Sequence, residues 1–168
     1  MNDRELTLYL SEIEEQCRFA TIAWKEIETS NLDTQWYSIQ ALLVAVANVS
    51  RLLWPDKGGD AERGRELRKR LSIGDNHPFK AGDMRNAFEH SDQRLDSWVA
   101  SAERGIHVGS MYIDPGSGAL DDSRFGRHFD RDTGVVTFNR QKYDIGLAAS
   151  EAHMLGQKAT KVVKDIED

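Results

Sequence analysis

Apolar side chains recur at alternating steps of four and three residues through the first part of the chain. This spacing places side chains on one stripe of an α-helix, and it predicts a helix over residues 4–28. The stripe comprises Leu6, Leu10, Ile13, Cys17, Ala20, Trp24 and Ile27. A helix with so long an apolar stripe docks on other helices, so the pattern favours a helical protein.

Three further segments have helical spacing. Residues 36–54 are apolar almost all round and predict a central helix, which Pro55 and the Gly58-Gly59 pair would end. Residues 60–71 read as a short, highly charged helix. Helical spacing returns over residues 84–103 and again over residues 143–166, where it predicts a last helix.

Residues 105–140 break this helical pattern. Glycines recur, residues 107–113 are β-prone, and Asp132-Thr133-Gly134 separates residues 127–130 from residues 135–138 in the manner of a hairpin. The predicted fold class is therefore all-α: an up-and-down bundle of four to five helices with a small insertion, containing a β-hairpin, between the last two long helices. At 168 residues the chain is expected to form one domain over residues 1–168.

Composition limits the compartment in which this chain works. No apolar run is expected to reach the roughly 18 residues of a membrane span, and the start of the chain lacks a secretory signal. The single cysteine, Cys17, falls on the apolar stripe and is expected to be buried. These features predict a cytoplasmic protein without membrane contact.

The residues with the most chemical potential are six in a row near the start of the helix predicted over residues 84–103. They read Arg85-Asn86-Ala87-Phe88-Glu89-His90, and we call them the hexad. An arginine neutralises phosphate through paired hydrogen bonds, and a histidine gives or takes a proton near neutral pH. At 100° per residue Asn86 lies one turn from His90, and Arg85 one turn from Glu89, so the amide and the carboxylate can orient the other two groups.

An arginine, a polar residue, three more residues and a histidine in a helical bundle resemble the Arg-x-x-x-x-His signature of the HEPN superfamily. The resemblance covers the helical frame and does not extend to the insertion at residues 105–140. It implies a homodimer in which two hexads line one cleft, and a metal-independent endoribonuclease of toxin or defence type. No cofactor and no metal ion are implied.

The resemblance also implies residue roles. His90 would act as general base or acid in attack of the ribose 2′-hydroxyl on the adjacent phosphate, and Arg85 would stabilise the charge of the transition state. Asn86 and Glu89 would orient that pair. The expected partners are an RNA substrate at a local site, a second copy of the chain, and an antitoxin protein.

A second hypothesis is a non-catalytic HEPN-like module that binds a partner protein or a nucleotide. The net charge of −6 excludes a protein that coats nucleic acid broadly, since such binding relies on Lys and Arg. Acidic neighbours of the hexad, Asp92 and Asp96, would also repel a phosphate backbone. The basic run at residues 63–70 is typical of a solvated helix face.

Two further groups of residues carry weaker expectations. His128, Asp130 and Asp132 alternate along the predicted hairpin and could share one face, which would suit a cation, but a polar exposed strand explains them as well. Asn48 and Arg51 lie on the otherwise apolar central helix and need partners if buried. We expect one of these two to contact the hexad.

Overall fold

The structure, a computed structural model, describes residues 1–29, 32–55, 60–80, 91–101, 111–113, 127–138 and 141–168. The chain divides into two compact units, each described by itself. The helical unit comprises Met1–Arg85 and Ala148–Asp168, and the sheet unit comprises Asn86–Leu147. The expectation of a single domain stays a prediction.

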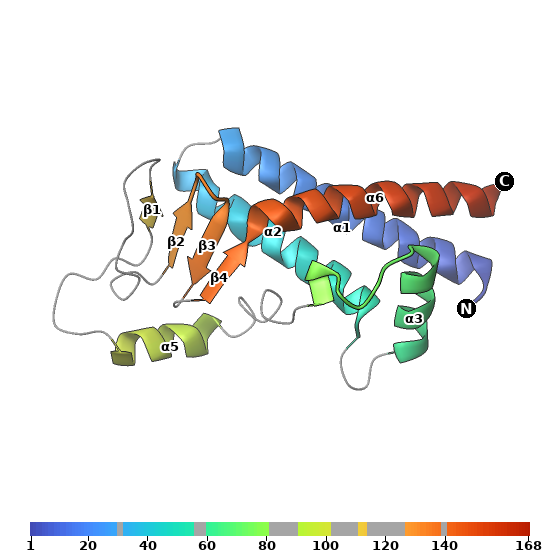
Figure 1. Ribbon diagram of the computed structural model, residues 1–168, viewed down its shortest axis with the longest axis horizontal. Coiled ribbons are helices and arrows are strands. Elements are labelled where there is room, and N and C mark those ends of the chain that lie inside the picture. Colours follow the sequence, from blue (N-terminus) through green and yellow to red (C-terminus); the bar gives the residue numbers. More distant parts are fainter. Residues whose placement is uncertain (30–31, 56–59, 81–90, 102–110, 114–126, 139–140) are drawn as a thin grey trace. The chain divides into compact units, whose positions relative to one another are not determined.

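Two long antiparallel helices form the centre of the helical unit (Figure 1). They are α1 (Asp3–Thr29) and α2 (Leu32–Leu53). Helix α1 begins with a capping box, in which Asn2 and Glu5 exchange hydrogen bonds between side chain and backbone N–H, both at 2.9 Å. At the other end, the Gln35 side chain of α2 donates to the Ile27 carbonyl of α1.

The predicted stripe of α1 is confirmed as the buried face of that helix. Six of its members are at most 2% exposed, whereas Ala23 replaces the half-buried Trp24 in the fully buried set. Helix α2 buries a matching set against it: Ile39, Leu42, Leu43, Ala45, Val46, Val49 and Leu53. The seam between α1 and α2 is therefore the largest part of the core of the helical unit, to which α3, η1 and α6 add further buried residues.

Helix α3 (Ala61–Arg70) crosses the end of α2 at very close range. Asp60 caps it by accepting from the backbone N–H of Arg63 at 3.0 Å. At the crossing stands Gly64, where a Cβ would lie 2.7 Å from the Leu53 carbonyl oxygen and 2.7 Å from the Pro55 ring. The glycine is thus required by the approach of two backbones.

The last helix, α6 (Ile145–Glu167), packs on α1 through a small residue. At Gly156 a Cβ would lie 3.1 Å from the Cβ of Cys17. Cys17 is 1% exposed, and burial raises the pKa of its thiol to about 12. The expectation of a buried cysteine is confirmed.

The sheet unit contains helix α5 (Ser91–Ser101) and a four-stranded sheet. Strand β1 (Met111–Ile113) pairs in parallel with β2 (Arg127–Asp130), and β2, β3 (Val135–Phe138) and β4 (Gln141–Asp144) pair antiparallel in that order. The predicted hairpin is confirmed as β2 and β3, and Gly134 ends its turn at φ 68°. Asp144 caps α6 by accepting from the Leu147 N–H at 2.7 Å.

The sequence prediction was right for the class and incomplete for the sheet. The chain is mostly helical with a small β-containing insertion, as expected. The last helix begins at Ile145 rather than near Tyr143, because residues 141–144 add an unpredicted strand to the hairpin. A strand of four residues that buries only Tyr143 has too short an alternation to be seen in the sequence.

Helix α2 is also long and apolar enough, over Thr34–Leu53, to span a membrane by length and composition alone. The expectation that no apolar run reaches this length was therefore wrong for this stretch, whose mean hydropathy is 1.2. More than half of it is buried inside the structure. Its buried apolar residues belong to the core of the helical unit, whereas Tyr37 and Val44 are exposed.

Replacing Gly64 by alanine is expected to destabilise the protein. The added Cβ meets a carbonyl oxygen and a proline ring, neither of which can swing aside, and overpacking of this kind costs about 1–3 kcal/mol. This outweighs the gain in helix propensity, which is at most about 1 kcal/mol. Urea unfolding measures the difference. Lys69→Ala on the exposed face of α3 is the control, and a Gly64→Ala protein as stable as wild type would contradict the crossing geometry.

Candidate functional site

The hexad lies outside the described residues. The described chain ends at Lys80 and resumes at Ser91, so Arg85, Asn86, Glu89 and His90 have no assigned position. Their expected roles, and the expected contact with Asn48 or Arg51, stay predictions. The structure does describe the chain immediately before the hexad and the surfaces of the helical unit.

The turn that precedes the hexad is firmly held. It is the 3₁₀ helix η1 (Pro78–Lys80), whose Phe79 is 2% exposed. The Ser50 hydroxyl of α2 donates to the Phe79 carbonyl at 2.6 Å, and the Phe79 N–H donates to Nδ1 of His77 at 3.3 Å. We call residues 77–80 the anchored turn. The buried Phe79 side chain and the hydrogen bond from Ser50 to the Phe79 carbonyl hold this turn to the helical unit.

His77 connects the anchored turn to α6. Its Nε2 lies 3.5 Å from Oε2 of Glu151, and its side chain is only 13% exposed. The ring packs edge-on against Phe79, with centroids 4.9 Å apart, and beside Trp54 at 5.9 Å. Because Nδ1 accepts from Phe79, the proton of the neutral ring is on Nε2 and faces Glu151.

The electrostatics of His77 favour a structural role. Burial lowers the pKa of the imidazole, and Lys158 lowers it further, although Glu151 opposes both by raising it. With one ring nitrogen bound to backbone and the other beside a carboxylate, neither is open to a substrate. His77 is therefore a neutral side chain that joins η1 to α6, and it does not act as a general base.

A second polar group surrounds the exposed carboxylate of Asp75. Trp54 Nε1 donates to it at 3.4 Å, Lys80 Nζ lies 3.3 Å away, and Arg68 Nε lies 4.0 Å away. The hydrogen bonds from Trp54 and Lys80 lower the pKa of this carboxyl group. Lys80 and Arg68 are therefore already paired and do not form an open phosphate clamp.

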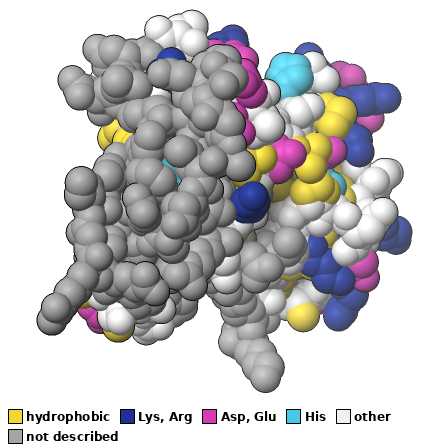
Figure 2. All heavy atoms as spheres, turned by 60° about the vertical axis from the view of Figure 1, so that its left-hand side comes forward, with side chains coloured by type: hydrophobic (Ala, Val, Ile, Leu, Met, Phe, Trp, Pro, Cys, Tyr) yellow, Lys and Arg dark blue, Asp and Glu magenta, His cyan; other side chains and the backbone are white. Residues whose placement is uncertain are grey.

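The basic run on α3 is also used within the protein. Arg63 donates to the Arg51 carbonyl and lies over the Tyr9 ring, and Arg68 donates to the Leu53 carbonyl. Arg65 and Arg70 form ion pairs with carboxylates of the same helix. On the face drawn in Figure 2, Lys and Arg side chains lie next to Asp and Glu side chains. The expectation of a solvated face holds for Arg65 and Arg70, whereas Arg63 and Arg68 are part-buried and bind carbonyl groups outside α3.

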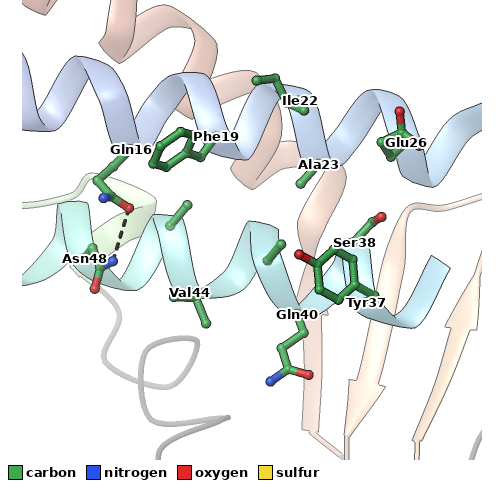
Figure 3. Close-up of a pocket in the computed structure, with 12 residues that line it drawn as sticks. Gln16, Phe19, Ile22, Ala23, Glu26, Tyr37, Ser38, Gln40, Val44 and Asn48 are labelled. Atoms are coloured by element: carbon green, nitrogen blue, oxygen red, sulfur yellow. Dashed lines mark hydrogen bonds between the residues drawn. The ribbon is translucent and has the colours of Figure 1, made fainter. Parts of the chain in front are cut away.

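An apolar groove runs along the seam of α1 and α2, with a volume of about 640 Å³ (Figure 3). At one end Asn48 donates to Gln16 at 3.1 Å, and Arg51 approaches Asn48 at 3.5 Å. Four large apolar side chains line it while remaining exposed: Phe19 and Ile22 from α1, and Tyr37 and Val44 from α2. Glu26 is the one charged residue among the described residues that line this groove. It lacks the cations that a phosphate-binding cleft requires.

The three side chains considered for a cation site on the hairpin do not share one strand. Asp132 lies in the turn at residues 131–134, not on β2 with His128 and Asp130, so the strand does not align the three. The Asp130 carboxylate instead accepts from the backbone N–H groups of Asp132 and Thr133, at 2.9 and 3.3 Å. Within the described ranges no three His, Cys, Asp or Glu side chains are placed to hold a metal ion.

No family model, no curated protein and no solved structure matches this chain. The candidate sites therefore rest on the chemistry of the residues alone.

Sequence reasoning missed the anchored turn and the groove. The anchored turn joins Ser50 to Phe79 across 29 residues, and no local pattern contains that bond. The groove carried a signal that could have been used. Phe19 and Ile22 are large apolar residues that stand outside the stripe of α1, and such residues mark a second apolar face.

Stability is expected to fall as the pH drops below about 6.5, the ordinary pKa of histidine, in part because of His77. The native pKa of this residue is lowered, so the unfolded chain binds the proton first, and the loss grows until the pH passes the native pKa. Urea unfolding between pH 8 and pH 5 measures it. His77→Gln should flatten the pH dependence, and His153→Gln, at an exposed position of α6, is the matched control for loss of an imidazole. If the free energy of unfolding had the same pH dependence in wild type and His77→Gln, His77 would not be held neutral in the folded protein.

Proposed function

We propose that this chain is a metal-independent endoribonuclease of toxin or defence type, a homodimer built as an up-and-down helical bundle of the HEPN kind. The observation that carries the proposal is the spacing Arg85-Asn86-Ala87-Phe88-Glu89-His90 in a mostly helical chain. The proposed partners are a local RNA substrate, a second copy of the chain and a restraining antitoxin. The proposed compartment is the cytoplasm.

The proposed chemistry uses side chains only. His90 removes the proton of a ribose 2′-hydroxyl, whose oxygen attacks the neighbouring phosphorus, and the 5′-oxygen of the next nucleotide leaves with a proton supplied by the partner's His90 or by water. Arg85 stabilises the extra negative charge on the phosphorus oxygens. Asn86 and Glu89 hold the imidazole and the guanidinium in place. The products are a 2′,3′-cyclic phosphate and a free 5′-hydroxyl.

Two features of the described residues support a site in this part of the chain. Catalytic groups need a rigid support, and the anchored turn, bound by Ser50 and beside Glu151, ends five residues before Arg85 in the sequence. In addition, the described histidines and cations near that turn are already paired. His77, Lys80 and Arg68 are thereby poor competitors for the role that the hexad is proposed to fill.

The second candidate function is a HEPN-like interaction or nucleotide-binding module without catalysis. The apolar groove favours it, since its lining suits a protein surface and not a phosphate backbone. The net charge of −6 points the same way. In this case Arg85 and His90 would be structural.

Cleavage of a mixed RNA substrate in EDTA tests the proposal. Wild-type protein is expected to cleave, and Arg85→Ala and His90→Ala are each expected to lose activity by about 100-fold or more, the usual effect of removing an acid–base or charge-stabilising group. Product ends, read by mass spectrometry, should carry the cyclic phosphate.

Two matched variants control for loss of charge and of imidazole elsewhere. Arg65→Ala on α3 and His153→Ala on α6 remove exposed side chains of the same types and should cleave as wild type does. Cleavage by His90→Ala at the wild-type rate would eliminate the mechanism. If no protein cleaves at any RNA concentration while all remain folded, the interaction module takes its place.

A further inference from the structure

We infer that the groove between α1 and α2 binds a small organic cation with an apolar tail. The charged head lies beside Glu26 and Tyr37, and the tail lies along the floor of the groove. The inference goes beyond the proposed function, and the groove contains no residue of the hexad. Ligand binding and RNA cleavage can therefore succeed or fail separately.

The size of the groove points to a small molecule. Its volume of about 640 Å³ lies within the range of about 300–1,000 Å³ that is usual for small-molecule sites. On α1 it extends from Gln16 to Glu26, a stretch of helix that rises about 15 Å. A protein partner in a standard interface covers about 800 Å² on each side. A groove of this length supplies only part of that area, so a protein would have to extend well beyond it.

The shape of the groove suits an aliphatic tail. Ala23, Ser38 and Ala45 line it and are at most 5% exposed, so small side chains form its floor. The exposed apolar side chains on α1 and α2 stand on either side of that floor (Figure 3). A tail that lies between them removes its own apolar surface and theirs from water, which is favourable.

The charge of the groove selects a cation. Glu26 is exposed, and among the described residues that line the groove no Lys or Arg accompanies it. This carboxylate attracts an ammonium group and repels a carboxylate or a phosphate. The net charge of −6 acts in the same direction, because it raises the concentration of cations near the protein. An amphipathic ligand with an anionic head is therefore disfavoured.

The two ends of the groove differ, and the difference orients the ligand. At one end the polar groups bind each other, since Asn48 donates to Gln16 at 3.1 Å and Gln16 donates to Glu12 at 2.8 Å. At the other end Glu26 on α1 and Tyr37 on α2 lie on facing helices (Figure 3). The Tyr37 side chain is 76% exposed, and the face of an aromatic ring attracts cations. A carboxylate beside such a ring is suited to an ammonium head.

Three probes that share one tail and differ in the head test the class of ligand. They are octylammonium, octanol and octanoate, each added to the full chain from about 0.01 to 10 mM, a range that covers weak small-ligand affinities. In methyl NMR spectra the signals of Ala23, Ala41 and Ala45 should shift, and octylammonium should have the lowest dissociation constant and octanoate the highest. If no probe binds saturably, or if octanoate binds as tightly as octylammonium, the inference is overturned. The groove would then be left to a larger partner.

A charge variant tests the position of the head. Glu26→Gln should raise the dissociation constant of octylammonium about threefold, the effect of losing one exposed ion pair, and should leave that of octanol unchanged. Glu28→Gln removes another exposed carboxylate of α1, outside the groove, and is the matched control. Octylammonium that binds Glu26→Gln as tightly as wild type contradicts the proposed head site.

A second variant tests the position of the tail. Ala41→Phe places a large ring in the groove and should abolish saturable binding of octylammonium and octanol. Leu8→Phe, at an exposed position of α1 outside the groove, should not. Circular dichroism checks that both variants keep their helices. A folded Ala41→Phe protein that binds as wild type does would place the ligand elsewhere and overturn the inference.

Discussion

The antiparallel contact of α1 with α2 is the interaction on which the helical unit depends. Each helix buries one apolar face in this seam, where Leu10, Ile13, Leu42 and Val46 are at most 2% exposed. Helix α3 crosses the end of α2 at Gly64, and α6 approaches α1 at Gly156. Gly64 is required by the nearby Leu53 carbonyl and Pro55 ring, and Gly156 by the nearby Cβ of Cys17.

The same seam accounts for the groove. Two helices that pack through one face each leave the opposite edges of that face open, and here those edges carry Phe19, Ile22, Tyr37 and Val44 instead of charged residues. The hydrophobic effect makes such a surface costly in water unless something covers it. The core of the helical unit and its exposed groove therefore involve the same two helices.

The anchored turn shows how a few polar side chains fix the position of a loop. Ser50 on α2 donates a hydrogen bond to the Phe79 carbonyl, and the His77 ring accepts one from the Phe79 N–H. Glu151 on α6 faces the other nitrogen of that ring. Buried backbone groups need partners of this kind, so the turn has one favoured position. In the sequence, the turn ends five residues before Arg85, the first residue of the hexad.

The sequence by itself determined the helices of the helical unit, the hairpin and the buried state of Cys17. Periodicity decides these because burial of a helix face or a strand face is a local property, repeated every 3.6 or 2 residues. The hexad, with its proposed roles for Arg85 and His90, is also a product of sequence alone. Only the tertiary structure decided the β4 strand, the pairing of the α3 arginines, the contacts that join His77 to α6 and the groove. The contacts of His77 and the groove depend on partners many residues apart, as does the bond from Ser50 to Phe79, and local patterning contains no information about which distant segments meet. Arg63 and Arg68 likewise reach carbonyl groups 12 and 15 residues away, and β4 is too short for its alternation to be seen in the sequence.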